Sequence, residues 1–482
     1  MPRPAASAIL LMPVSVWLIV SPAAAHAFGQ RYDLPLPLWL YTSGAGATVA
    51  LSFVVMRLFL RPSHAAGEAY SLDILGVPGL RWIGHGWLAT AVQAASCGLF
   101  MLIVAACFFG DPDPFNNIAP TFVWVIWWVG LAFISALVGN LWDLLNPWRI
   151  LFTWVEKFRR TPPARRAYLA WLGHWPAVLL FFAFAWMELI SEAGEKPCIL
   201  GVLIVVYSLI TWAGMARFGR DAWLRHGEVF SVVFGVLARF APLHGGNGQL
   251  QLRFPAVGLL VDKPVSMSYV CFVLLLLTSV TFDGILETPY WQSFLAWVSE
   301  SAALRGMLVT LQRSGFDLLV LIETLALVVL PVIFIGVYLL VSWLIGRAGS
   351  SRLGMGDLAG FFVLSLVPIA IAYHLSHYLS YLLIAGQNII PLASDPFGAG
   401  SDLFGTKTYR IDIAIVNAKM VWYVAVTAIV IGHVIAVYVA HIMALRVFET
   451  PRQAVLSQIP MLALMVAYTM VSLWILSQPI VS

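Results

Sequence analysis

The chain has 482 residues, of which 61% are hydrophobic and only 10% are charged. Soluble globular proteins carry about 25% charged residues, so this composition excludes an ordinary soluble enzyme. Apolar stretches recur at the roughly 20-residue length that a helix needs to cross a bilayer, and the mean hydropathy is +0.89. The sequence therefore predicts an all-α, polytopic transmembrane helical bundle whose first partner is the lipid bilayer. The formal charge of +4 says little about other partners, because basic residues in such a protein serve its topology.

The first 27 residues are typical of a secretory signal peptide, with a basic start, an apolar centre and small residues at the end. Two cleavage positions fit the small-x-small pattern, after Ala25 or after Ala27. The first leaves His26 as the new N-terminus, where its amine and imidazole can chelate copper, and the second removes it. Residues 28–482 then form a single integral-membrane domain.

About ten further apolar stretches are long enough to cross the membrane as helices. Lys and Arg of short loops stay in the cytoplasm, and alternate loops hold 18 of the 27 basic residues. This alternation is consistent at every loop when the mature N-terminus is periplasmic. We therefore expect a multi-pass protein of the bacterial inner membrane with both mature ends in the periplasm. The predicted spans are 36–60, 87–109, 119–140, 167–190, 198–215, 265–285, 317–345, 357–385, 417–445 and 456–478.

Four segments outside the spans are predicted to have structure of their own. Residues 141–158 and 222–240 mix basic and aromatic residues at helical spacing, which is typical of helices that lie in the cytoplasmic interface. Residues 290–312 predict one interfacial helix on the periplasmic side. The segment 386–416 is rich in turn-forming Pro, Gly, Asp and Ser, and we interpret it as a periplasmic loop suited to act as a lid.

The span 357–385 contains two histidines three residues apart, in the run AYHLSHYLSYLL. His374 and His377 share one helical face, which Tyr378 and Tyr381 extend. Ionisable residues inside a membrane are functional candidates, and imidazoles with nearby carboxylates suit divalent transition metals. The sequence therefore predicts a metal site that holds zinc, copper, iron or manganese, or a site that handles protons.

Other ionisable residues of the spans are expected in the periplasmic half of the bilayer, at a rise of about 1.5 Å per residue. Asp283 and Glu287 end one outward span, and Glu323 lies near the outer end of the next span. His433 lies near the middle of a later span. The predicted metal ligands are His374, His377, His433, Glu287 and His26, and the predicted proton acceptors are Glu323 and Asp283.

These residues also have structural interpretations. A lone intramembrane histidine often only bonds a neighbouring helix, which is the preferred interpretation for His441. A solvated helix end is an equal alternative for Asp283, Glu287 and Asp317, and it is the preferred interpretation for Glu188. Glu228, in the run HGEVF, lacks the context of an HExxH motif. The sequence has no Walker loop and no GxSxG motif, and nothing in it indicates nucleic-acid binding.

Two stretches carry a family resemblance. HAFGQRYDLPLPLWLY at 26–41 resembles the start of bacterial multi-pass membrane proteins identified as fenitrothion hydrolases, and GNLWDLLNPWR at 139–149 is similar to the same group. The resemblance in length and span pattern covers the whole chain. It implies hydrolysis of an apolar organophosphotriester to a nitrophenol and a dialkyl thiophosphate, and it assigns no catalytic residues. Water activated by a metal at His374, His377 and His433, with Glu323 or Asp283 as the proton acceptor, is compatible with this chemistry.

Two other classes of function remain open. A proton- or metal-ion-coupled transporter would use the carboxylates and histidines as an ion path, with broken helices near the middle of the membrane. A haem b protein would place histidines across two spans. We rank the hydrolase first, the transporter second and the haem protein third.

Overall fold

Most of the chain is described in the computed structural model. The predicted signal peptide, its two cleavage positions and His26 lie outside the described residues, so they stay predictions. The described residues are 34, 36–59, 71–77, 86–158, 166–246 and 249–481.

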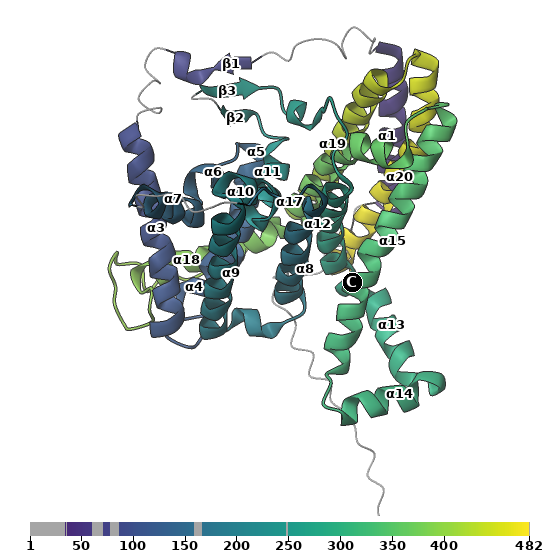
Figure 1. The fold of residues 1–482 in the computed structure, drawn as a ribbon. Helices are drawn as coiled ribbons and strands as arrows, with labels where there is room; N and C mark the ends of the chain where they lie inside the picture. Colours follow the sequence, from purple (N-terminus) through teal and green to yellow (C-terminus); the bar gives the residue numbers. More distant parts are fainter. Residues whose placement is uncertain are drawn as a thin grey trace, which may run out of the picture.

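Ten helical segments of the described chain are long and apolar enough to cross a membrane. They pack as a bundle (Figure 1), and their ends lie within a few residues of most predicted ends. The prediction of an all-α polytopic bundle is therefore confirmed. The segments are α1 (Leu38–Phe59), α3 (Gly86–Phe109), α4–η3–α5 (Ile118–Leu137), η4–α8 (Ala170–Leu189), α9 (Pro197–Phe218), α12 (Met267–Leu286), α15 (Leu318–Ala348), α16–η7–α17–η8–α18 (Met355–Ser394), α19 (Ala418–Val447) and α20 (Pro451–Val481).

Side-chain caps fix the starts of two of these helices. Asp317 precedes α15 and accepts the N–H groups of Leu319 at 2.9 Å and Val320 at 3.2 Å. Asn417 precedes α19 and accepts the N–H of Met420 at 2.7 Å. Such caps satisfy N–H groups that have no partner within the helix. Asp317 is therefore a structural cap.

Burial differs sharply between the spans. In the most apolar stretch of α12, 83% of the residues are buried, against 11% in α15. The span that contains α17 (Val367–Ala385) is also 83% buried. Helices α12 and α17 contact each other in the interior. Polar side chains on α12 and α17 therefore meet inside the protein, while α15 lies at its periphery.

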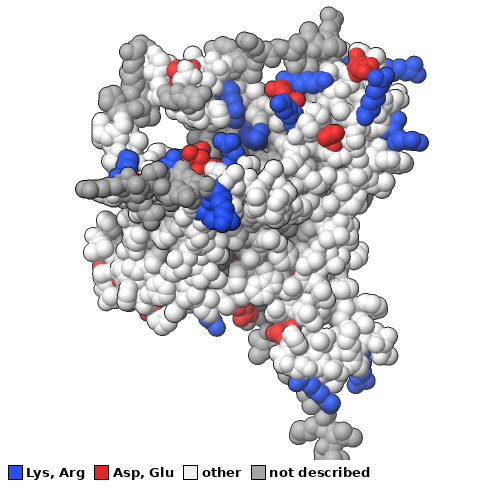
Figure 2. Space-filling view, in the orientation of Figure 1, with Lys and Arg blue, Asp and Glu red and all other residues white. Residues whose placement is uncertain are grey.

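One end of the bundle carries a small antiparallel sheet that the sequence did not predict. Its strand order is β1 (Ser71–Asp73), β3 (Gln249–Arg253) and β2 (Leu243–Gly246), and Leu252 pairs with both Leu72 and Leu243. Lys and Arg side chains gather around this end (Figure 2). This is the end that the loop charges predict to be cytoplasmic.

The prediction of an interfacial helix over 222–240 is wrong. The segment is broken into α10 (Arg220–His226) and α11 (Val229–Ala238), and eight of the ten residues of α11 are buried. Helix α11 packs on α5 (Leu131–Leu137) and α8 (Trp175–Leu189). Its sequence, VFSVVFGVLA, is apolar on every face, and such a helix is stable only when it is covered.

A buried carboxylate holds the break between α10 and α11. Glu228 is 0% exposed and accepts the backbone N–H groups of Phe230 at 3.1 Å and Ser231 at 2.8 Å. The side chains of Asn146, at 3.1 Å, and Tyr207 donate to the same carboxylate. Glu228 therefore ties the start of α11 to α9 and to the segment before residue 147.

The periplasmic expectations are met in part. Residues 290–312 form two helices, α13 (Pro289–Glu300) and α14 (Ala302–Arg313), which are bent by 85°, so the prediction of one helix is wrong. The extended backbone of Ser301 separates the two helices. The segment 386–416 packs on α4 and η3 through α18 (Ile389–Ser394), and its role as a lid stays a prediction.

Replacing Glu228 by Ala should destabilise the protein. Five donors, which include Trp142 Nε1 at 3.5 Å, would lose a shared buried acceptor, and we expect a loss of about 3 kcal/mol in the free energy of unfolding. Thermal unfolding of the detergent-purified variant measures this loss. Glu449→Ala removes an exposed carboxylate and is the matched control. Equal melting temperatures for the two variants would contradict the assignment.

Candidate functional site

The carboxylate of Asp283, in the last turn of α12, connects the two most buried spans. His377 Nε2 donates to Asp283 Oδ2 at 2.8 Å, and the Tyr378 hydroxyl donates to the same oxygen at 2.7 Å. The His377 side chain is 2% exposed and that of Asp283 is 15% exposed. The structure therefore brings together two of the predicted site residues, one from each of the two most buried spans.

His374 lies on the same helix as His377 but faces different neighbours. Its ring packs at 5.7 Å from Phe133 and 6.4 Å from Trp128, as ring centroids. Its Nε2 is buried and has no hydrogen-bond partner among the described residues. The ring of Tyr378 lies at 4.8 Å from both imidazoles, so it separates the two.

Glu188, at the end of α8, completes this group. Its Oε1 accepts a hydrogen bond from Trp128 Nε1 at 2.5 Å. It is not the solvated helix end that the sequence predicted, because it is half-buried and bonded to another span. We call Glu188, Asp283, His374, His377 and Tyr378 the acid–base cluster.

The indole of Trp128 is carried by an unusual helix. Residues Thr121–Gly130 form η3, a π-helix of ten residues. Such segments are rare in proteins and are frequent at functional sites, because the wider turn changes where side chains point. Here η3 packs against α17, with Trp128 between Glu188 and His374.

A small closed cavity lies beside the cluster. Its volume is about 20 Å³, which is room for about one water molecule. The wall includes three members of the cluster, so the space is polar on one side and apolar on the other. The lining residues are Trp128, Ala132, Glu188, Leu189, Val233, Leu237, Leu276, Ser279, Val280, Ala370, His374 and Tyr378.

The two other predicted carboxylates differ in their distance from the cluster. Glu287 ends α12 and interacts electrostatically with His377, so it lies at the edge of the cluster. Glu323 lies on the peripheral α15, where its electrostatic neighbour is Asp317. Glu323 does not line the cavity, and the structure does not bring it into the cluster.

The two histidines of α19 have other contacts. His433 Nδ1 donates to its own helix at the carbonyl of Ile429, at 2.8 Å, and its ring lies 6.1 Å from that of Tyr468. His441 Nδ1 bonds Gln458 Oε1 at 2.9 Å. The structural interpretation of His441 agrees with this contact, and His433 packs against α20 rather than in the cavity.

The predicted metal site was tested against these positions. The described part of the chain contains no group of three or more His, Cys, Asp and Glu side chains that could hold one ion. His377 already donates to Asp283, and His374 lies on the other side of Tyr378. His26 lies outside the described residues, so the metal site stays a prediction, and the proposed chemistry is derived from the side chains alone.

Trp128 is the functional residue that the sequence analysis missed. It stands in the run TFVWVIWWVG, where tryptophan is expected to belong to the aromatic belt. An indole N–H inside an apolar span needs a hydrogen-bond acceptor. This requirement is the sequence signal from which a nearby carboxylate could have been predicted. Which tryptophan faces inward depends on the packing of the helices.

Comparison with protein-family models, curated proteins and solved structures finds no match to this chain. The function is therefore argued from the cluster itself.

Proposed function

We propose that this membrane protein is a hydrolase that performs acid–base chemistry at the acid–base cluster. The observation that carries the proposal is the 2.8 Å contact between His377 Nε2 and Asp283 Oδ2 in the interior of an apolar bundle. An imidazole oriented by a carboxylate is the commonest proton acceptor in enzymes. The substrate class, an apolar organophosphotriester, comes from the family resemblance.

The position of the cavity supports a role for each side chain. His374 lines the cavity and its Nε2 has no partner among the described residues, so this atom is free to take the proton of a water molecule as the water oxygen bonds to phosphorus. The bond from phosphorus to the aryl oxygen breaks, and the nitrophenolate leaves with the electron pair. Asp283 stabilises the positive charge on the neighbouring imidazoles.

The cavity volume sets a condition for this reaction. About 20 Å³ holds a water molecule and not a triester. An apolar triester concentrates in the bilayer, and it reaches the water only after lining side chains such as Leu189 move. Movement of side chains that gate a site is common in enzymes.

Hydrolysis of fenitrothion by the purified protein tests the proposal through release of the nitrophenol. Asp283→Asn keeps the size of the side chain but removes the charge that orients His377. We expect kcat/KM to fall by about 100-fold or more. His441→Gln, which alters a buried histidine outside the cluster, should leave the rate nearly unchanged. No hydrolysis by the wild type, or equal losses in both variants, would overturn the assignment.

Metal analysis of the same preparations tests the cofactor prediction separately. Stoichiometric zinc, copper, iron or manganese that is lost in His374→Ala/His377→Ala would establish a metal site. An optical spectrum with a Soret band would instead favour the haem protein.

A proton-coupled transporter is the second candidate, and one observation favours it. The span Met355–Ser394 is interrupted by a 3₁₀ segment, Val363–Leu366, which separates α16 (Met355–Phe362) from α17. Interrupted spans beside buried ionisable residues are typical of transporters. Proton uptake by proteoliposomes that is lost in Asp283→Asn would support transport. The same protein should then show no hydrolysis of triesters.

The inner bacterial membrane and periplasmic mature ends are also part of the proposal. The support is the gathering of Lys and Arg at the end that carries the sheet (Figure 2). Cys198, at the start of α9, lies next to a loop proposed to be periplasmic. It is exposed, whereas Cys97, Cys107 and Cys271 are buried.

A membrane-impermeant maleimide should label the wild-type chain in intact spheroplasts through Cys198. The control Cys198→Ser should not react. In that background, Arg352→Cys places a thiol at an exposed position on the proposed cytoplasmic side, and it should react only after permeabilisation. The reverse pattern would invert the topology.

A further inference from the structure

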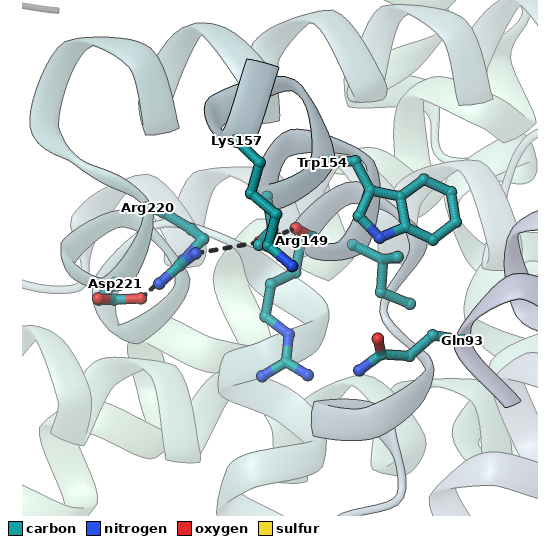
Figure 3. Close-up of a pocket in the computed structure, with 8 residues that line it drawn as sticks. Gln93, Arg149, Trp154, Lys157, Arg220 and Asp221 are labelled. Carbon is teal, nitrogen blue, oxygen red and sulfur yellow. Dashed lines mark hydrogen bonds and ion pairs between the residues drawn. The ribbon is translucent and has the colours of Figure 1, made fainter. Parts of the chain in front are cut away.

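A second and larger cavity lies far from the acid–base cluster in the sequence. Its volume is about 250 Å³, and it lies between α3, α7 (Pro147–Phe158) and α10. Figure 3 shows its lining side chains. This volume is slightly below that of pockets for drug-sized ligands, so it suits a small polar group. The lining residues are Gln93, Arg149, Ile150, Thr153, Trp154, Lys157, Arg220 and Asp221.

The charges of this cavity are strongly unbalanced. Arg149, Lys157 and Arg220 line it together with a single carboxylate, that of Asp221. Arg149 and Lys157 stand eight residues apart on α7, which places them on one face of that helix. Neither has an ion-pair partner among the described residues.

Arg220 is held in place by its own contacts. Its guanidinium donates to Asp221 at 2.9 Å, to Thr153 Oγ1 at 3.0 Å and to Glu156 at 3.4 Å. Burial lowers the pKa of Arg149, the carboxylates of Asp143 and Asp221 oppose this change, and the positive charge of Arg220 adds to it. In Figure 3 the amide of Gln93 points toward the Arg149 guanidinium. Three cations and an amide thus line one space, and of the three only Arg220 is within ion-pair distance of a carboxylate among the described residues.

We propose that this cavity binds the phosphate group of an anionic phospholipid headgroup through its lining Arg149, Lys157 and Gln93. Arginine, lysine and amide donors on a rigid wall suit phosphate oxygens. Basic pockets between helices on the cytoplasmic side recognise such headgroups. On the same helix, Val155 and Phe158 are 53% and 89% exposed, which offers apolar surface for an acyl chain. A free phosphate ion has the same chemistry and is distinguished by the test.

The test is binding of short-chain phosphatidylglycerol to the full chain in mild detergent, with phosphatidylcholine as the neutral lipid. The wild type should bind phosphatidylglycerol about tenfold more tightly or better. Arg149→Gln/Lys157→Gln should lose this preference. Arg347→Gln/Arg352→Gln removes the same charge outside the cavity and should retain it. If the double variant fails to fold, Lys157→Gln alone takes its place in the test, because Lys157 is exposed and its substitution does not disturb the core.

Inorganic phosphate is titrated against the same proteins. Lipid binding that millimolar phosphate does not displace supports the headgroup. Phosphate that binds alone and is lost in Arg149→Gln/Lys157→Gln would assign the site to free phosphate and overturn the lipid. Two outcomes would overturn the site itself. One is equal binding of both lipids by the wild type with no binding of inorganic phosphate, and the other is an equal loss of binding in both double variants.

Discussion

Pairing of buried polar groups in an apolar bundle is the constraint on which this structure depends. One carboxylate oxygen of Asp283 accepts both His377 and Tyr378, and it links α12 to α17 at the centre of the protein. A buried polar group without a partner costs several kcal/mol. The positions of two side chains on α17 are therefore set by a single acceptor on α12.

The same constraint operates at the other end of the bundle. Glu228 accepts five donors and fixes where α11 begins. Val233 and Leu237 of α11 then form part of the cavity wall beside His374. A carboxylate near the basic end of the protein thus helps to shape the space in which we place the chemistry.

The spans could be predicted from the sequence because their signal is local. A run of about 20 apolar residues has few other uses, and the described helices follow those runs. The segment of α11 was predicted to lie in the interface because the flanking Arg225 and Arg239 make the wider sequence basic and amphipathic. The ten residues of α11 itself are apolar and mostly buried. The bend between α13 and α14 depends on one residue, Ser301, whose conformation no periodicity reveals.

The candidate site could be predicted only in part, for a reason that lies in the packing. Helical spacing predicts that His374 and His377 share one face, but α17 belongs to one of the two most buried spans and packs against several other elements. A small angle between the two side chains around the helix axis is then enough for the His377 ring to contact Asp283 and the His374 ring to contact Trp128. On a peripheral helix such as α15, the same pair would share one interface.

This division of α17 explains the importance of Tyr378. Its hydroxyl bonds Asp283, while its ring lies against both imidazoles. The two sides of α17 are therefore connected through one phenol. His374 Nε2 has no hydrogen-bond partner in the described part of the chain, but the charges of Asp283 and His377 both act on this imidazole. The proposed hydrolysis needs this electrostatic link, because His374 becomes positively charged when it takes a proton from water. Proton transport would need more, since the proton would also have to pass from the cavity to the carboxylate of Asp283.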